Sequence, residues 1–335
     1  MLKPLLQHPF RFLRHYVRTL AFRNLSVHDS AQRTNAFNAQ PEAPALWIAL
    51  CEMCRRLRLG VKHHWNHMPD CDKHRIRPGQ KVSLRKLDTD GKDIAKDREG
   101  CEELFRKQRT KLAELQEKLY AEGRQKLLVV FQAMDGGGKD GTIRSVFQGV
   151  NPQGVVVTSF KAPTSEELAH DFLWRIHKAV PGAGTIGVFN RSHYEDVLVV
   201  RVHNIVPESV WKPRYQRIND FEKLLTDSGT RIVKFFLHIS KSEQKQRFEE
   251  RIRDPAKRWK FDPTDLEKRK SWDEYQQAFE DMLENCSTGD APWYVVPADQ
   301  NWYRDFVVTS VLVDTLSSMN PKYPDPPDVT GVVVV

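Results

Sequence analysis

Five short and almost continuously apolar runs are separated along the chain by longer stretches with apolar residues at helical spacing. The runs are 127–132 (LLVVFQ), 155–159 (VVVTS), 185–189 (TIGVF), 232–239 (IVKFFLHI) and 293–296 (WYVV). Runs of this kind are typical of strands buried on both faces. Their alternation with helices predicts an α/β fold in which right-handed crossovers place helices around a parallel sheet.

Residues 99–122 form the clearest amphipathic pattern outside these runs. Leu104, Leu112, Leu115 and Leu119 recur at helical spacing, and Gly123 is a suitable stop just beyond. We predict a helix that leads into the first strand. Composition then divides the chain into a basic, poorly ordered extension (1–75), a lead-in (76–125), a body (126–320) and a proline-rich surface tail (321–335).

The net charge of +8 is concentrated at one end of the chain. Residues 1–75 hold 12 Lys+Arg against 5 Asp+Glu, whereas the other 260 residues hold 40 against 39. The body is therefore near neutral, and no regular motif or aromatic platform accompanies the basic residues, so we expect no specific nucleic-acid partner. No apolar run approaches the roughly 18 residues of a membrane span, which predicts a protein without a membrane partner.

The basic extension permits two further interpretations. The first 28 residues lack Asp and Glu, as organellar transit peptides do, but a plain basic extension of a cytoplasmic protein is the interpretation we favour. The five cysteines are odd in number, which indicates a reducing compartment. A zinc site is compatible with the local composition but fits no strict spacing; its candidates are Cys51, Cys54, His63, His64, His67, Cys71 and His74.

The strongest chemical signal is the glycine-rich segment 133–142, AMDGGGKDGT, between the first strand and a helix. Glycines let backbone N–H groups approach phosphate oxygens, and Lys139 and the helix N-terminus add positive charge. Ala133 and Asp140 depart from the Walker A pattern, so Asp135 replaces the missing hydroxyl as a metal-binding or orienting carboxylate. A turn without a ligand is the disfavoured alternative. The predicted phosphate-binding residues here are Gly136, Gly137, Gly138, Lys139, Asp140, Gly141 and Thr142.

A second polar segment, NRSHYED at 190–196, follows the third apolar run. Arg191 is suited to grip two phosphoryl oxygens, and Glu195 and Asp196 are candidates for binding Mg²⁺ or orienting an acceptor. Surface ion pairs are the alternative interpretation, and His193 is expected to be a packed histidine. Further predicted groove residues, each equally compatible with a structural role, are Arg144, Lys161, Arg175 and Asn190.

Basic residues also gather between the fourth and fifth apolar runs. Arg247, Arg251, Lys257 and Lys260 are predicted to close over a transferring phosphoryl group as a lid. A solvated helical hairpin explains the same charges equally well. From the residues alone, both interpretations remain open.

Seven blocks taken in order resemble the family-2 polyphosphate kinases over about residues 75–325. They are FQAMDGGGKDGTIRSV, VNPQGVVVTSFKAPT, FLWRIH, FNRSHYEDVLVVRVH, KFFLHISKSEQKQRF, DPAKRWKFDPTDLEKRKSWDEY and APWYVVPADQNWYR. The resemblance implies a P-loop kinase-like, three-layer αβα fold similar to thymidylate kinase, with a five-stranded parallel sheet and a helical lid near 241–275. It also implies phosphoryl transfer between inorganic polyphosphate and nucleotides, with Mg²⁺ or Mn²⁺, in a homodimer or homotetramer.

The resemblance also implies roles for single residues. Asp135 and Lys139 take the catalytic and phosphate-binding roles of the loop, Arg191 is the phosphate clamp, and Arg251 belongs to the lid. Glu195 after Tyr194 resembles the class that accepts AMP as well as ADP. From the residues themselves, Asp135 and Asp196 are the expected metal ligands. Two alternatives remain: an ATP-dependent nucleoside or nucleotide kinase of similar fold, and a non-catalytic module that binds nucleotides or nucleic acid.

Overall fold

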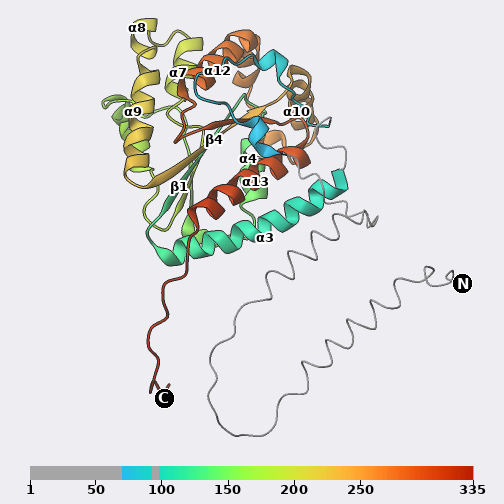
Figure 1. Ribbon diagram of the computed structural model, residues 1–335. Helices are drawn as coiled ribbons and strands as arrows, with labels where there is room; N and C mark the ends of the chain where they lie inside the picture. Colours follow the sequence, from blue (N-terminus) through green and yellow to red (C-terminus); the bar gives the residue numbers. More distant parts are fainter. Residues whose placement is uncertain (1–69, 93–97, 335) are drawn as a thin grey trace, which may run out of the picture. The chain divides into compact units, whose positions relative to one another are not determined.

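A parallel sheet organises the part of the chain described by the computed structural model, residues 70–92 and 98–334 (Figure 1). Its strands lie in the order β2-β3-β1-β4-β5, and every pairing is parallel. The five apolar runs are these strands, which confirms the predicted α/β fold. Their bounds are β1 Lys126–Ala133, β2 Val155–Ser159, β3 Ile186–Asn190, β4 Thr230–His238 and β5 Trp293–Pro297.

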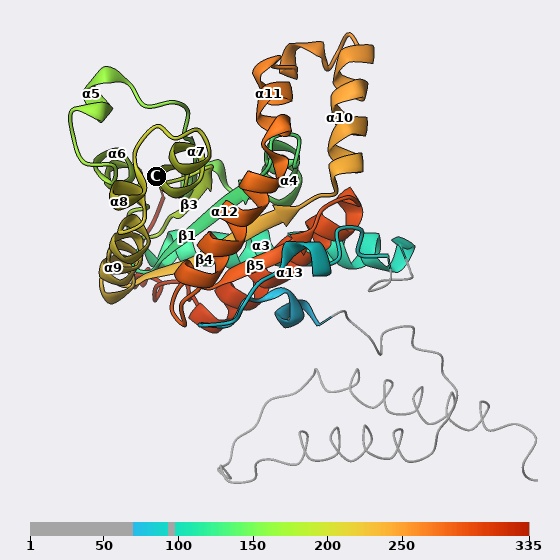
Figure 2. The same cartoon turned by 90° about the horizontal axis from the view of Figure 1, so that it is seen from above.

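Helices cover both faces of the sheet, so the fold has three layers with the sheet in the middle. On one face α13 (Asn301–Met319) packs against α3 (Arg98–Glu122) and α4 (Lys139–Val146); on the other, α12 (Trp272–Cys286) packs against α7 (Glu195–Val202) and α9 (Arg214–Asp227) (Figure 2). The remaining helices are α5 Ser165–Leu168, α6 Trp174–Lys178, α8 Glu208–Trp211, α10 Lys241–Arg253 and α11 Thr264–Lys270. The 3-10 turns are η1 Cys71–His74, η2 Leu84–Lys86, η3 Pro152–Gly154 and η4 Arg258–Lys260.

The core sits around the central strand. Every residue of β1 after Lys126 is buried, and β1 pairs with β3 on one side and β4 on the other. The register places Phe131 opposite Asn190, so the carboxyl ends of β1 and β3 lie together. In an open parallel sheet this edge is the usual place for a ligand.

The prediction that all five strands are buried on both faces is wrong for β2. It is an edge strand that pairs only with β3, and Val156 and Val157 are 52% and 49% exposed. Its valines satisfy the apolar pattern because β-branched residues also suit an edge strand. The pattern alone does not separate the two positions in the sheet.

The last residues of the extension, from Cys71, pack on the body together with the lead-in. The backbone N–H of Ile76 donates to the Trp293 carbonyl at 2.9 Å, and His74 Nε2 bonds the Tyr303 hydroxyl at 2.9 Å. Burial lowers the pKa of His74 to about 4 and raises that of the Cys71 thiol to about 12.

The other zinc candidates and the transit-peptide pattern lie outside the described residues. Within 70–92 and 98–334, no grouping of three or more His, Cys, Asp or Glu is arranged to hold a metal ion. No helix in these ranges is long and apolar enough to cross a membrane. The tail from 321 to 334 forms no helix or strand, and its side chains after Pro321 are exposed.

Candidate active site

The glycine-rich segment turns sharply between β1 and α4. Gly136 and Gly138 have φ angles of 80° and 95°, which glycine adopts without the strain of a Cβ. The Gly137 N–H donates to the Met134 carbonyl at 2.9 Å, and a Cβ at Gly137 would lie 2.5 Å from the Ala133 Cβ. The backbone therefore forms a tight loop at the N-terminus of α4, which favours an anion.

Lys139 lies beneath this loop rather than in solvent. Its side chain is buried, and Nζ donates to the Ala133 carbonyl at 3.1 Å. Burial and the nearby Arg191 charge lower the pKa of Lys139 to about 8, although Asp135 and Glu195 act in the opposite direction. The ammonium group is thus close to two carboxylates and to the loop that it would help to charge.

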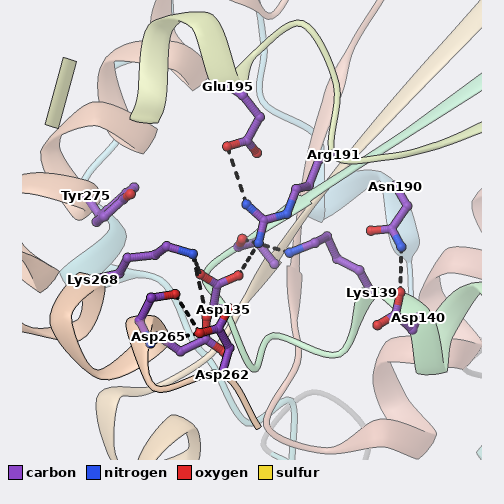
Figure 3. A network of polar contacts seen from close by, with 12 residues as sticks. Asp135, Lys139, Asp140, Asn190, Arg191, Glu195, Asp262, Asp265, Lys268 and Tyr275 are labelled. Atoms are coloured by element: carbon purple, nitrogen blue, oxygen red, sulfur yellow. Dashed lines mark hydrogen bonds and ion pairs between the residues drawn. The ribbon is translucent and has the colours of Figure 1, made fainter. Parts of the chain in front are cut away.

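Arg191 leaves the end of β3 in an unusual backbone conformation. Its φ is 62°, which is uncommon for a residue with a side chain, and its N–H donates to the Phe131 carbonyl at 3.1 Å. The guanidinium lies between two carboxylates: it donates to Asp135 and lies 3.6 Å from Glu195 (Figure 3). A non-glycine residue held in this region is typical of functional sites.

Asp135 is the centre of the charged network (Figure 3). Besides Arg191, it accepts a hydrogen bond from Lys268 of α11 at 3.0 Å. Burial works against ionisation, but Arg191, Lys139 and Lys268 outweigh it and lower the pKa of Asp135 to about 2. Asp265, one turn before Lys268, has a pKa raised to about 6 by burial and by the charge of Asp135.

A buried network behind the sheet edge anchors the segment that carries Arg191. Lys234 of β4 is inaccessible to solvent and donates to Glu222 at 2.5 Å and to the Tyr194 hydroxyl at 2.8 Å. Tyr194 in turn donates to Glu222 at 2.8 Å. His193 is also fully buried, 3.3 Å from Glu222, which confirms that it is a packed histidine.

The lid hairpin touches the loop through Arg247, a predicted lid residue, and through Gln244, which was not predicted. Arg247 of α10 donates to the carbonyls of Gly136 at 3.0 Å and Ala298 at 2.6 Å, and its Nε donates to Glu243 at 2.7 Å, so its donors are engaged within the protein. Gln244, one turn earlier, donates to the Asp135 carbonyl at 2.7 Å. The hairpin ends near Lys270, before the expected boundary at 275, because α12 buries Trp272 and Tyr275 in the core.

Of the predicted site residues, Asp135, Arg191 and Glu195 line one small cavity of about 20 Å³, and the Lys139 charge is near enough to interact with all three. Asn190 and Asp140 lie beside it, joined by a hydrogen bond of 2.5 Å. The Thr142 hydroxyl is bonded within the protein, because it donates to the Gly138 carbonyl at 3.1 Å. Gly141 lies in the first turn of α4.

Other predicted residues lie elsewhere. Asp196 accepts from Arg214 at 3.0 Å, and burial raises its pKa to about 6. Lys161 and Arg175 line a separate cleft of about 820 Å³ beside β2, whose lining includes no residue of the glycine-rich loop. Arg144 is exposed on α4.

Of the predicted lid cations, Arg251, Lys257 and Lys260 do not bond to the loop in this structure. Arg251 lies 3.6 Å from Asp265, and Lys257 is 3.8 Å from both Glu250 and Asp254. Lys260 is exposed.

Sequence reasoning missed Lys268, Gln244 and the buried Glu222–Lys234 pair. A signal existed for only one of them: Lys234 interrupts an otherwise apolar run, IVKFFLHI, and a lysine there needs a buried partner. The other two sit in strongly charged helical segments, where nothing local distinguishes them from solvent-facing neighbours.

The sequence is similar to those of known proteins over most of its length. The family model for polyphosphate kinase 2 (PPK2) matches residues 94–324. An AMP/ADP-polyphosphate phosphotransferase from Meiothermus ruber is 52% identical over 264 residues, which are 78% of this chain and 99% of that protein. An ADP-polyphosphate phosphotransferase from Rhodopseudomonas palustris is 47% identical over 263 residues, 75% of this chain and 91% of that protein.

A solved structure agrees in fold as well as in sequence. The crystal structure of polyphosphate kinase 2 from Arthrobacter aurescens TC1 is 46% identical, with a TM-score of 0.72. The likeness covers 75% of this chain and 90% of that one. The overall fold described above is therefore shared with that protein.

Proposed function

The chain belongs to the polyphosphate kinase 2 family, and we propose that it transfers a phosphoryl group between inorganic polyphosphate and the nucleotides AMP and ADP. The observation that carries the proposal is the convergence of Lys139, Arg191 and Asp135 at the carboxyl edge of the sheet, beside a tight glycine loop. Two cations and a row of backbone donors in one place suit a group that moves with negative charge on its oxygens.

Each residue has a defined part in this proposal. The loop and the N-terminus of α4 hold phosphate oxygens, while Lys139 and Arg191 offset charge on the transferring group. The strained backbone of Arg191 and the carboxylates of Asp135 and Glu195 on either side fix the position of its guanidinium. An arginine in this role is worth on the order of 10³–10⁵ in rate.

A divalent cation, Mg²⁺ or Mn²⁺, fits the carboxylates of this site. Asp135 would hold it, and Asp265 is a neighbouring second carboxylate, since the charge of Asp135 helps to raise its pKa. The described residues offer no set of three ligands, which suits Mg²⁺, because this ion usually keeps several waters and uses substrate phosphates. When bound, the cation would offset phosphate charge. Asp196 is instead engaged by Arg214.

Glu195 supports AMP as an acceptor alongside ADP. It begins α7 at the end of the segment that carries Arg191, and it lines the small cavity with Asp135 and Tyr275. The relative from Meiothermus ruber, named for both nucleotides, is 52% identical. From the family resemblance we further propose a cytoplasmic homo-oligomer.

The test is phosphorus NMR of the purified protein with Mg²⁺ and each pair of substrates. Polyphosphate with AMP should yield ADP and then ATP while the polyphosphate signal declines. ATP with a nucleoside or AMP, in the absence of polyphosphate, is the parallel arm. Transfer only in that second arm would replace the proposal with an ATP-dependent nucleotide kinase, and no transfer in either arm would leave a binding module.

A further inference from the structure

The buried side-chain amide of Gln244 connects α11 of the lid to the loop, because its nitrogen and its oxygen each make a hydrogen bond. Its Nε2 donates to the Asp135 carbonyl at 2.7 Å, and its Oε1 accepts from Arg269 at 2.7 Å. The residue is 1% exposed, so neither bond is replaced by water without cost. Arg269 belongs to α11, Gln244 to α10 and Asp135 to the loop.

The chemistry of this bridge admits only a side-chain amide. Arginine has donors alone, and the Asp135 carbonyl is an acceptor alone, so the amide orientation is determined by its partners. A glutamate at 244 would keep the bond from Arg269 and lose the bond to the carbonyl. A leucine would lose both.

The bond to the Asp135 carbonyl sets the direction of a donor in the loop. A trans peptide is planar, and its N–H points opposite to its C=O. When Gln244 holds the Asp135 carbonyl toward α10, the Gly136 N–H must point away from α10. Gly136 has φ 80°, and a Cβ there would meet Phe248 at 3.0 Å, so the loop is closely seated against the same helix.

Few apolar contacts hold α11 in place. Of its seven residues only Asp265 is buried. The helix is instead joined to its surroundings through consecutive side chains: Lys268 donates to the Asp135 carboxylate at 3.0 Å, and Arg269 donates to Gln244 and to the Lys241 carbonyl at 2.8 Å. An element held in this way opens more easily than the core.

We propose that Gln244 is a positioning residue that couples the placement of α11 to the shape of the phosphate loop, with Arg269 as its partner on the lid. When α11 is seated, Arg269 orients the Gln244 amide, and the amide orients the peptide between Asp135 and Gly136. When α11 lifts, the loop loses that restraint. The effect on catalysis rests on the function proposed above, whereas the coupling itself does not.

The test compares Gln244→Leu, Gln244→Glu and Arg269→Ala with two matched controls, Gln246→Leu and Lys270→Ala. The control side chains are exposed and bond only to neighbours on their own helices, at Glu250 and Glu267. Two readouts are taken on the full-length protein. One is kcat and KM for polyphosphate-dependent phosphorylation of ADP, and the other is amide hydrogen exchange of the segment 133–142 without substrate.

We expect Gln244→Leu and Arg269→Ala each to lower kcat about tenfold, the effect of one buried hydrogen bond, with a smaller change in KM. Gln244→Glu should lower kcat as much as Gln244→Leu. It replaces Gln244→Leu in the test if the leucine variant does not fold. The double variant Gln244→Leu/Arg269→Ala should be no slower than Gln244→Leu alone, because both changes break one connection. Arg269→Ala should speed exchange in the loop, which Arg269 does not touch, and the controls should not.

Several results would overturn the coupling: kcat within about twofold of the unmodified protein for Gln244→Leu, normal turnover of Gln244→Glu, or effects that multiply in the double variant. Unchanged loop exchange in Arg269→Ala would do the same. If the unmodified protein transfers no phosphoryl group, the proposed function fails, but the exchange measurement still decides whether the lid restrains the loop.

Discussion

On the body side of the site, the charged side chains arise from strand ends and are held by a buried scaffold. Arg191 follows β3, and the Lys234–Glu222 pair beneath it has exposed fractions of 0% and 2%. On the lid side, Lys268 reaches Asp135 from a helix that buries one residue, and the two side chains are 26% and 14% exposed. The same kind of ion pair is therefore made in two different environments.

This difference determines what each pair contributes. A buried pair costs desolvation on both partners, and losing one partner leaves an uncompensated charge in the core. A partly exposed pair is screened by water and salt, and its loss costs little stability. We therefore expect the body to supply fixed geometry and the lid to supply a reversible restraint.

The largest effect is expected from the body cations. Lys139→Ala and Arg191→Ala should each lower kcat by about 10³-fold or more, because each removes charge that faces the transferring group. The far-ultraviolet circular dichroism should be unchanged, since neither side chain packs an apolar core. Steady-state kinetics with polyphosphate and ADP measure the effect.

Lys111→Ala, an exposed change on α3, is the control and should retain full activity. Near-normal turnover in either the Lys139 or the Arg191 variant would contradict the assignment of the body side as the catalytic side.

The second effect concerns stability and compares the two ion pairs directly. Lys234→Met should lower the free energy of unfolding by about 3–5 kcal/mol, because Glu222 is then left charged and buried. Lys268→Met should cost at most about 1 kcal/mol. Urea unfolding followed by circular dichroism gives both values.

Adding Glu222→Gln to Lys234→Met removes the unpaired charge and should restore part of the loss. Equal destabilisation by the two lysine substitutions would show that burial does not distinguish the pairs.

The same division explains which features were predictable from sequence. The five strands and the cluster of Asp135, Lys139, Arg191 and Glu195 follow from local patterns, because parallel strands bring their carboxyl ends to one edge. Each of these residues lies within two residues of a strand end or opens a helix, so its position relative to the sheet is set within a few residues of chain.

The lid contacts were not predictable for the opposite reason. Lys268 lies 133 residues from Asp135 and Gln244 lies 109 residues from it, and both occur among many charged neighbours. Arg247 was predicted as a lid cation for the phosphoryl group, yet in this structure it donates to the carbonyls of Gly136 and Ala298 and to Glu243. Tertiary packing decides which cation of such a segment contacts the loop, and the periodicity of the sequence does not indicate it.

The smallest expected effect is a pH response of the lid that depends on Asp265. Cations, chiefly Arg191, lower the pKa of Asp135 to about 2, so its stabilising contribution is present above the ordinary value of 3.8 and is lost only as pH falls toward 2. Burial and Asp135 raise the pKa of Asp265 to about 6, against Lys268 and Arg251. Its contribution is present at low pH and is lost as pH rises through about 6.

Between pH 5 and pH 7.5, therefore, Asp265 should make the lid respond, whereas Asp135 stays ionised. Hydrogen exchange in residues 258–270, corrected for the intrinsic effect of pH, should be faster at pH 7.5, by less than about tenfold because solvent screens the charges. Asp265→Asn keeps the neutral form at both values and should remove the difference, while exchange in β1 stays constant. A response that persists in Asp265→Asn, or that appears equally in β1, would mean that lid and body do not differ in the way their charges are held.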